Sequence, residues 1–495
     1  MNPSSITTCL THRALLLAAA SALAGGCALQ TPPRDVSAAV APQWFAPTPS
    51  LDAPDALPHN GRLTDLTQWW DQQGDPLLVE LIASAQAVSP SIASARSRIE
   101  QARATRVAAG AALVPTLDAS ASSSRTRSPP QAPGASALAT TAQAGLQASW
   151  EMDLFGGKQA GRNAAIERLA GAEAQWHDAR VSVAAEVANQ YYSYTNCRAL
   201  AAITRADAAS RQETARLADL SMKAGFTAPA TAALARASAG DASARATEQA
   251  ARCELDVKAL VALSGLPEPV LRQKLLLAQQ TRAQAAPIFI ATVPADALLQ
   301  RPDIFNAARE VAAASDEIGS AQAERYPRLG LRGSIGTSRV RSGGVSSDFN
   351  TWSIGPVSLT VPLFDGGRRA ADVDAASARY DEAAANYRSR VRQAVREVEE
   401  ALVNLQSTAA RRADVQTAVD GYQTSFSGTE ALYKNGLASL VELEDARRTL
   451  LAAQTALASL QLSRSTAWVS LYRAMGGGWT PPANAASSAA GLLAR

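Results

Sequence analysis

Side chains that could carry out catalysis are few and scattered in this chain of 495 residues. The histidines are His12, His59 and His177, and no metal-spaced cluster or nucleophile elbow accompanies them. The run at 156–158 (GGK) is not a phosphate-binding loop, because Met152 stands where such a loop needs its first glycine. We therefore expect that the protein is not an enzyme and that it holds neither a metal nor a small cofactor.

Two of the four cysteines are predicted to form a disulfide bond. Cys9 and Cys27 lie in or beside an export signal, which leaves Cys197 and Cys253 in an oxidising compartment. Gly225 lies midway between them, and residues equidistant from the turn of an antiparallel helical hairpin face one another. We expect Cys197 and Cys253 to bond across such a hairpin. The alternative is two separate buried thiols.

The first residues are typical of a secretory signal peptide. Arg13 precedes an apolar stretch at 14–24, and small residues lead from there to Cys27. The ending LAGGC resembles a bacterial lipobox, in which Cys27 becomes the acylated first residue of the mature protein. Leu23 stands four residues before the cysteine instead of three, and ordinary cleavage is the alternative. If Cys27 is acylated, the resemblance implies sorting to the outer membrane, because Ala28 follows the cysteine in place of the aspartate associated with retention at the inner membrane.

The chain contains one pattern twice, about 211 residues apart. Gly225 in SMKAG corresponds to Gly436 in LYKNG, and LVALSG at 260–265 corresponds to LYRAMG at 471–476. A repeat of this length is a duplicated domain and not a solenoid unit. The predicted segments are a signal peptide at 1–26, an acylated leader at 27–68, a first repeat at 69–265, a linker at 266–293, a second repeat at 294–478 and a disordered tail at 479–495.

Each repeat is predicted to contain a pair of strands. In the clearest strand, apolar Leu146 and Trp150 alternate with polar Gln147 and other hydrophilic residues. In the last strand Gly355-Pro356 shifts the alternation by one residue, which predicts a bulge. The expected strands are 116–127 and 142–154 in the first repeat, and 327–340 and 351–363 in the second.

A very long helical hairpin is predicted after each strand pair. Apolar residues recur at helical spacing, without proline, over about 66 residues in each repeat, and at about 1.5 Å per residue this makes a rod of about 100 Å. The hairpins are expected at 157–263, turning at Gly225, and at 367–475, turning at Gly436.

Composition and charge exclude several classes of protein. The 47 basic and 44 acidic residues are nearly balanced and form no basic block, so nucleic acid is not an expected partner. Beyond the N-terminus no apolar run approaches the roughly 20 residues of a membrane helix, so strands have to make any membrane crossing. Four strands cannot enclose a lumen, for which about eight are needed. We therefore expect oligomerisation into a shared barrel, with a soluble sandwich as the alternative.

Three motifs resemble those of TolC-type outer membrane efflux channels, and in particular the lipoprotein branch that serves resistance-nodulation-division tripartite pumps. They are VPADALLQRPDI at 293–304, YPRL at 326–329 and PLFDGGR at 362–368. The resemblance covers about 69–476 and implies a mostly α fold with a membrane β-barrel. A homotrimer would form a twelve-stranded barrel and a periplasmic α-helical tunnel.

The resemblance also implies a function and partners. The protein would be the passive exit duct of a tripartite efflux system, located in the cell outer membrane, with a lipid on Cys27, and extending into the periplasm. Its partners would be a periplasmic adaptor protein, an inner-membrane pump and outer membrane lipid. An outer membrane conduit for type I protein secretion is the alternative within this class. A periplasmic adaptor with a single hairpin is disfavoured by the duplication.

Site residues follow from the same resemblance. Glu442 and Asp445 match the acidic rings that constrict the periplasmic aperture of the family, where three copies would favour cations. Tyr433 matches an aromatic residue that helps to hold the aperture closed. The turns at Gly225 and Gly436 would contact the adaptor. The alternatives are that the acids are solvated helix residues paired with arginine 447 or 448, and that the tyrosine merely packs the hairpin.

Overall fold

The computed structural model describes residues 29–40, 43–46, 69–72, 74–128, 137–278, 298 and 300–482. The signal peptide, Cys27 and the last residues of the tail therefore lie outside the described residues. The chain forms two compact units, each built from segments of both repeats. The first comprises Met1–Val36, Arg98–Ala172 and Asn306–Tyr387, and the second comprises Ser37–Ser97, Glu173–Phe305 and Arg388–Arg495.

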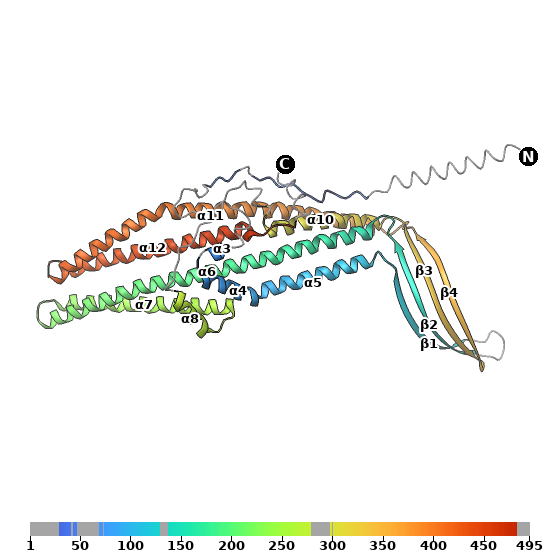
Figure 1. Ribbon diagram of the computed structural model, residues 1–495, viewed down its shortest axis with the longest axis horizontal. Coiled ribbons are helices and arrows are strands. Elements are labelled where there is room, and N and C mark those ends of the chain that lie inside the picture. Colours follow the sequence, from blue (N-terminus) through green and yellow to red (C-terminus); the bar gives the residue numbers. More distant parts are fainter. Residues whose placement is uncertain are drawn as a thin grey trace, which may run out of the picture. The chain divides into compact units, whose positions relative to one another are not determined.

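The described elements are mostly helices, with one group of four strands (Figure 1). In chain order they are α3 (Trp69–Gln72), α4 (Pro76–Val88), α5 (Pro90–Ala111), β1 (Thr116–Ser128), β2 (Ala137–Met152), α6 (Gly157–Lys223), α7 (Pro229–Ser264), α8 (Glu268–Ala278), α10 (Pro302–Ala323), β3 (Arg328–Ser342), β4 (Val345–Thr360), α11 (Arg368–Lys434), α12 (Leu440–Ala474) and the short 3₁₀ helix η1 (Gly476–Gly478).

The four strands form one antiparallel sheet in the order β1-β2-β3-β4. Leu146 of β2 pairs with Ile335 of β3, and Ile335 pairs with Trp352 of β4, so the apolar residues of three strands share one face. Their exposed fractions are 43%, 61% and 75%. The sheet therefore presents an apolar face that nothing in the described part of the chain covers.

Two of the predicted strands begin several residues too late, while the starts of the other two are right to within one residue. β2 begins at Ala137 instead of 142, because its backbone ladder with β1 continues to the pair Ser128–Ala137 even where side chains stop alternating. β4 begins at Val345 instead of 351, since Gly343 and Gly344, with φ of 58° and 86°, close a two-residue hairpin turn.

The bulge expected at Gly355-Pro356 is present. Leu331 pairs with Val357 and Gly333 with Ile354, so β4 has one residue more than β3 across this step. The Gly355-Pro356 peptide bond is cis.

Both long helices begin in the same way. Asp153 follows β2, and its carboxylate accepts hydrogen bonds from the backbone N–H groups of Lys158 and Gln159 at 3.1 and 2.7 Å. Asp365, its counterpart in the second repeat, accepts from the N–H groups of Gly367 and Arg369. A carboxylate at this position satisfies free N–H groups and complements the helix dipole. α6 and α11 each run for 67 residues, about 100 Å.

Both hairpins also turn in the same way. Gly225 and Gly436 have φ of 82° and 74°, a conformation that favours glycine. The N–H of Phe226 donates to Ser221 O at 2.9 Å, and the N–H of Leu437 donates to Leu432 O at the same distance. This is the hydrogen-bond pattern of a Schellman cap, which ends a helix at a left-handed residue. α7 then returns beside α6, and α12 beside α11 (Figure 1).

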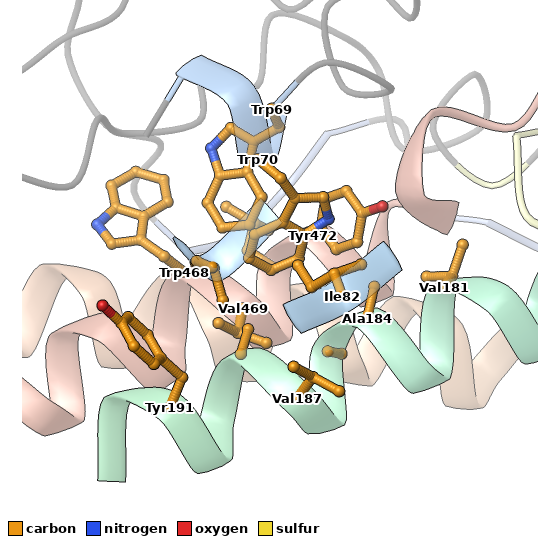
Figure 2. Close-up of a cluster of buried hydrophobic side chains, with 14 of the residues drawn as sticks. Trp69, Trp70, Ile82, Val181, Ala184, Val187, Tyr191, Trp468, Val469 and Tyr472 are labelled. Carbon is orange, nitrogen blue, oxygen red and sulfur yellow. The ribbon is translucent and has the colours of Figure 1, made fainter. Parts of the chain in front are cut away.

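The largest buried cluster joins both hairpins to the start of the first repeat (Figure 2). Trp69 stacks on Tyr472 with 5.1 Å between ring centres, and the Trp70 ring meets the same tyrosine edge-on at 4.8 Å. Val187 of α6 and Leu402 of α11 are fully buried in the same cluster. Many of the other buried residues of the long helices are alanines.

The predicted linker contains a helix, and the predicted tail needs correction. The linker expected at 266–293 contains α8, whose Leu271 and Leu275 are buried, because these leucines fall at helical spacing. The tail was expected to be disordered from 479, but the Trp479 ring packs edge-on against Phe305 at 5.2 Å. In the leader, Pro32 accepts a hydrogen bond from Ser315 of α10 at 2.6 Å.

No single helix among the described residues has both the length and the apolar character to cross a membrane, although α4 and α5, bent by 49°, meet that test as a pair.

Candidate functional site at the hairpin ends

The ends of the two hairpins are held together by small side chains. Ala215 and Ala218 of α6, Ala235 of α7 and Leu440 of α12 are buried in one cluster, and Tyr433 of α11 packs against it. Alanine allows the helix backbones to approach closely, so polar groups on neighbouring helices come within hydrogen-bonding distance.

A buried network of charged residues lies beside this cluster. Arg211 of α6 is only 7% exposed, and its Nε donates to Asp207 at 2.9 Å. One Nη of Arg211 donates to the Ser238 hydroxyl of α7 at 2.6 Å and also pairs with the Glu444 carboxylate of α12. Ser238 in turn donates to Glu444 at 2.8 Å. Three helices therefore meet at one carboxylate.

A second buried arginine completes the network. Arg447 of α12 is 3% exposed and donates to the same Glu444 at 2.9 Å. It also donates to the hydroxyls of Ser210 and Thr214 on α6, at 2.9 and 2.7 Å, and lies over the Phe426 ring. The positive charges of Arg211 and Arg447 are balanced by the carboxylates of Asp207 and Glu444. Burial of such groups is tolerated only while every charge keeps its partner.

Glu442, predicted to line an aperture, lies in the first turn of α12 and is exposed. Its carboxylate accepts from the Ser439 N–H at 2.6 Å, while the Ser439 hydroxyl accepts from the Glu442 N–H at 3.2 Å. This capping box holds the start of the helix. The hydrogen bonds from Ser439 lower the pKa of Glu442, so the carboxylate stays ionised.

Asp445, the second predicted aperture acid, is exposed and forms an ion pair with Arg448 one turn further along. The structure thus shows the pairing that the alternative interpretation described. Within one chain Glu442 and Asp445 do not share a contact: the first caps α12 and the second pairs with a neighbouring arginine.

Tyr433 packs half-buried against the alanine cluster and is close enough to the charged network to respond to it. Burial raises the pKa of Tyr433, Arg447 opposes the increase, and Glu444 adds to it. The ring therefore packs the hairpin end and also lies near the network.

The buried arginines were missed by sequence analysis, although a signal was available. Leu440, Leu443, Arg447 and Leu450 are all buried on α12, at the 3, 4, 3 spacing of a helix-packing stripe. On α6 Arg211 occupies the equivalent place in a stripe of buried alanines. Where the helical spacing of apolar residues places a charged residue in the buried stripe, that residue is expected to have a buried partner of opposite charge.

A groove of about 1000 Å³ opens beside the network. Its charged lining residues are Arg211, Asp241, Arg245, Glu444, Asp445 and Arg448. Within the described part of the chain no group of three or more histidine, cysteine or acidic residues could hold a metal ion. The ion pairs and hydrogen bonds of the network join α6, α7 and α12 at the edge of this groove.

The structure contains the bond between Cys197 and Cys253. It joins α6 to α7 with 5.5 Å between the Cα atoms, across a sequence separation of 56 residues. Both residues are buried, and Gly225 lies at the turn midway between them. A covalent bond therefore joins the two helices of the first hairpin at a point distant from its turn.

A strand sheet with an exposed apolar face, joined to two long helical hairpins, defines the subunit of an outer membrane channel. The family model described as "Outer membrane efflux protein" matches residues 81–266 and 293–477, which is more than half of the chain. The chain belongs to this family, and it is an outer membrane efflux protein.

Relatives and solved structures agree with this assignment. The chain is 32% identical to the solvent efflux pump outer membrane protein SrpC of Pseudomonas putida, over 83% of this chain and 87% of that protein. It is 30% identical to the pyoverdine export outer membrane protein OpmQ of Pseudomonas aeruginosa, over 94% and 97%. The open state of the MtrE outer membrane channel of Neisseria gonorrhoeae superimposes with a TM-score of 0.76 at 25% identity, over 92% and 99%.

Proposed function

We propose that three copies of this chain form one closed channel, the passive exit duct of a tripartite efflux system for small molecules. The observation that carries the proposal is the sheet. It has only four strands, its apolar face is exposed, and β1 and β4 are open edges. An open edge in a bilayer leaves backbone groups unpaired, and about eight or more strands are needed to close a barrel. Twelve strands from three copies remove every edge.

Cross-linking tests this closure directly. A cysteine replaces Ser124 on the β1 edge, and a second cysteine is scanned along β4, from Ser347 to Thr351. The native cysteines described here are already bonded to one another and do not interfere. We expect a ladder of covalent dimers and trimers at one register. Cross-linked species at no register would contradict the shared barrel.

Small molecules are favoured as cargo because of the relatives. SrpC is named for solvent efflux and OpmQ for pyoverdine export, and neither name refers to a protein substrate. We propose that this chain passes its cargo without covalent chemistry. A deletion strain should become sensitive to a subset of toxic compounds, and normal tolerance across a broad panel would argue against the proposal.

The hairpin turns are proposed to contact a periplasmic adaptor protein, which connects the channel to an inner-membrane pump. Phe226 and Leu437 follow the turn glycines at equivalent positions and are 87% and 75% exposed. Two such apolar residues at the ends of hairpins suit a protein partner. A photo-cross-linker at either position should capture the adaptor, whereas the same group at exposed Tyr422 of α11 should not.

We propose that the network around Glu444 keeps the hairpin ends together when the channel is closed, and that Glu442 and Asp445 form acidic rings in the trimer. Removing both acids should reduce block by divalent cations in single-channel recordings.

We also propose a covalent lipid on Cys27. Mass spectrometry of the mature N-terminus tests this proposal, and an unmodified terminus would contradict it.

A further inference from the structure

Four arginines lie at the end of the sheet that is farther from the helices. Arg125 and Arg127 belong to β1, and Arg339 and Arg341 belong to β3. Thr140 of β2 pairs with Arg125 on one side and with Arg341 on the other, so these two arginines lie two strand spacings apart, about 10 Å. We call these four residues the arginine rim.

All four arginines share the apolar face of the sheet. Side chains alternate between faces, and Arg339 and Arg341 are an even number of residues from Ile335, whose 61% exposed side chain lies on the apolar face. The opposite face carries Ser338 and Ser342 at this level, and no charge. At this level of the sheet the cationic residues therefore lie on the apolar face.

The rim has a strong excess of positive charge. Its described acid is Asp348 of β4, which pairs with Arg339 through two bonds of 2.6 and 3.0 Å. Among the described residues neither Arg125 nor Arg341 has an ion-pair partner, and both are exposed. The connecting segment 129–136 (PPQAPGAS) contains no charged residue in its sequence. Arg125 and Arg341 thus contribute two positive charges that no acid among the described residues neutralises.

The height of the rim matches the surface of a membrane. Leu329, at the start of the apolar face, and Arg339 are ten residues apart on β3. Ten residues at about 3.3 Å each span about 33 Å along the strand, and a tilt of about 40° reduces this to about 25 Å across the bilayer. The apolar band of membrane barrels is about 25 Å tall, and arginine within it is costly. The rim therefore lies at the level of the lipid head groups.

We propose that the arginine rim binds the phosphate groups of the phosphorylated glycolipid in the outer leaflet. The proposal rests on the membrane-spanning sheet proposed above. The guanidinium group binds phosphate through paired hydrogen bonds, and clusters of basic residues at a membrane surface bind anionic head groups. The spacing of Arg125 and Arg341 lets them bind separate phosphate groups of one glycolipid or of adjacent molecules.

Lipid titration by native mass spectrometry tests the proposal on the purified full-length assembly. The probes are lipid A with both phosphates and the same lipid after dephosphorylation. The test variant combines Arg125→Gln with Arg341→Gln, which leaves the Arg339–Asp348 pair intact. Each basic residue at an anionic lipid surface strengthens binding about fivefold, so the double variant should bind the phosphorylated lipid about 25-fold more weakly.

Matched controls separate a phosphate site from general damage. Arg332→Gln removes an exposed arginine from the opposite face of β3 and should bind like the wild type. The variant Arg125→Lys with Arg341→Lys keeps both charges and should lose less than the glutamine variant. Unchanged binding by the glutamine variant, or equal wild-type binding of the dephosphorylated lipid, would overturn the proposal.

The assembly itself is monitored in the same samples. Mass and channel conductance are recorded for each variant, so failure of the trimeric channel is recognised separately from loss of lipid binding. If the glutamine variant does not assemble, the lysine variant and the phosphate dependence of wild-type binding still decide the matter.

Discussion

Replacing Glu444 by glutamine should release the start of α12 from α6 and α7. Glu444 is the carboxylate that Arg211 and Arg447 share, and their side chains are 9% and 3% exposed. Glutamine keeps the shape and removes the charge. Breaking a buried pair costs about 3–5 kcal/mol, and we take about 3 kcal/mol because the Glu444 side chain is 19% exposed and Arg211 keeps Asp207. This corresponds to about a hundredfold change in the opening equilibrium.

Hydrogen exchange measures this opening locally, whatever the stability of the remaining molecule. Backbone amides at 440–450 should exchange about a hundredfold faster in the Glu444→Gln variant, while those around Trp69 and Tyr472 should be unchanged. Glu430→Gln is the control, because it removes a partly exposed pair with Lys434 on α11 that contributes at most about 1 kcal/mol. Equal protection of the wild type and the Glu444→Gln variant would refute the claim that the ion pairs of Glu444 hold α12 against α6 and α7.

Three further predictions concern other parts of the helices. Replacing Cys197 and Cys253 by alanine should lower stability by about 2–4 kcal/mol, seen as a lower melting temperature than that of the wild type; an unchanged value in non-reducing buffer would count against a structural bond. Gly436→Ala should destabilise the turn by about 1–2 kcal/mol, because the φ angle of Gly436 is 74°. Gly428 lies inside α11 without a close neighbour, so Gly428→Ala should be neutral or stabilising. A lower melting temperature for Gly428→Ala than for Gly436→Ala would contradict this reasoning. Burial, with Asp303 nearby, raises the pKa of Asp178, so its ionised form opposes folding above that pKa. Asp178→Asn should therefore raise the melting temperature at pH 7. The gain should shrink as the pH falls from the raised pKa of the folded state towards the unfolded value of about 4, and it should vanish at lower pH, where the carboxyl is protonated in both states. A gain that grows towards acid pH would show that the sign is wrong.

Features that depend on local chemistry could be predicted from the sequence. Alternation around Leu146 and Trp150 indicated a two-faced strand, and the glycines at 225 and 436 marked turns because few other residues accept a positive φ. The disulfide followed from symmetry about such a turn, since helix geometry brings equidistant residues together. These arguments need only the spacing of residues along a strand or a helix.

Features that depend on partners distant in sequence could not be predicted. The start of β2 at Ala137 is set by its ladder with β1, and Trp479 is ordered by the Phe305 ring. The network needs Arg211 and Glu444, which are 233 residues apart, whereas the residues that match the family motif include Glu442 and not Glu444. A repeat predicts which elements recur, but it does not predict which charges are buried between them.

Single-channel recording in planar bilayers tests the central claim most directly. If each chain provides a third of the barrel wall, as proposed, the purified protein should migrate as a trimer and open in uniform conductance steps. Chains that remain monomeric in mild detergent and insert without conductance would contradict the account.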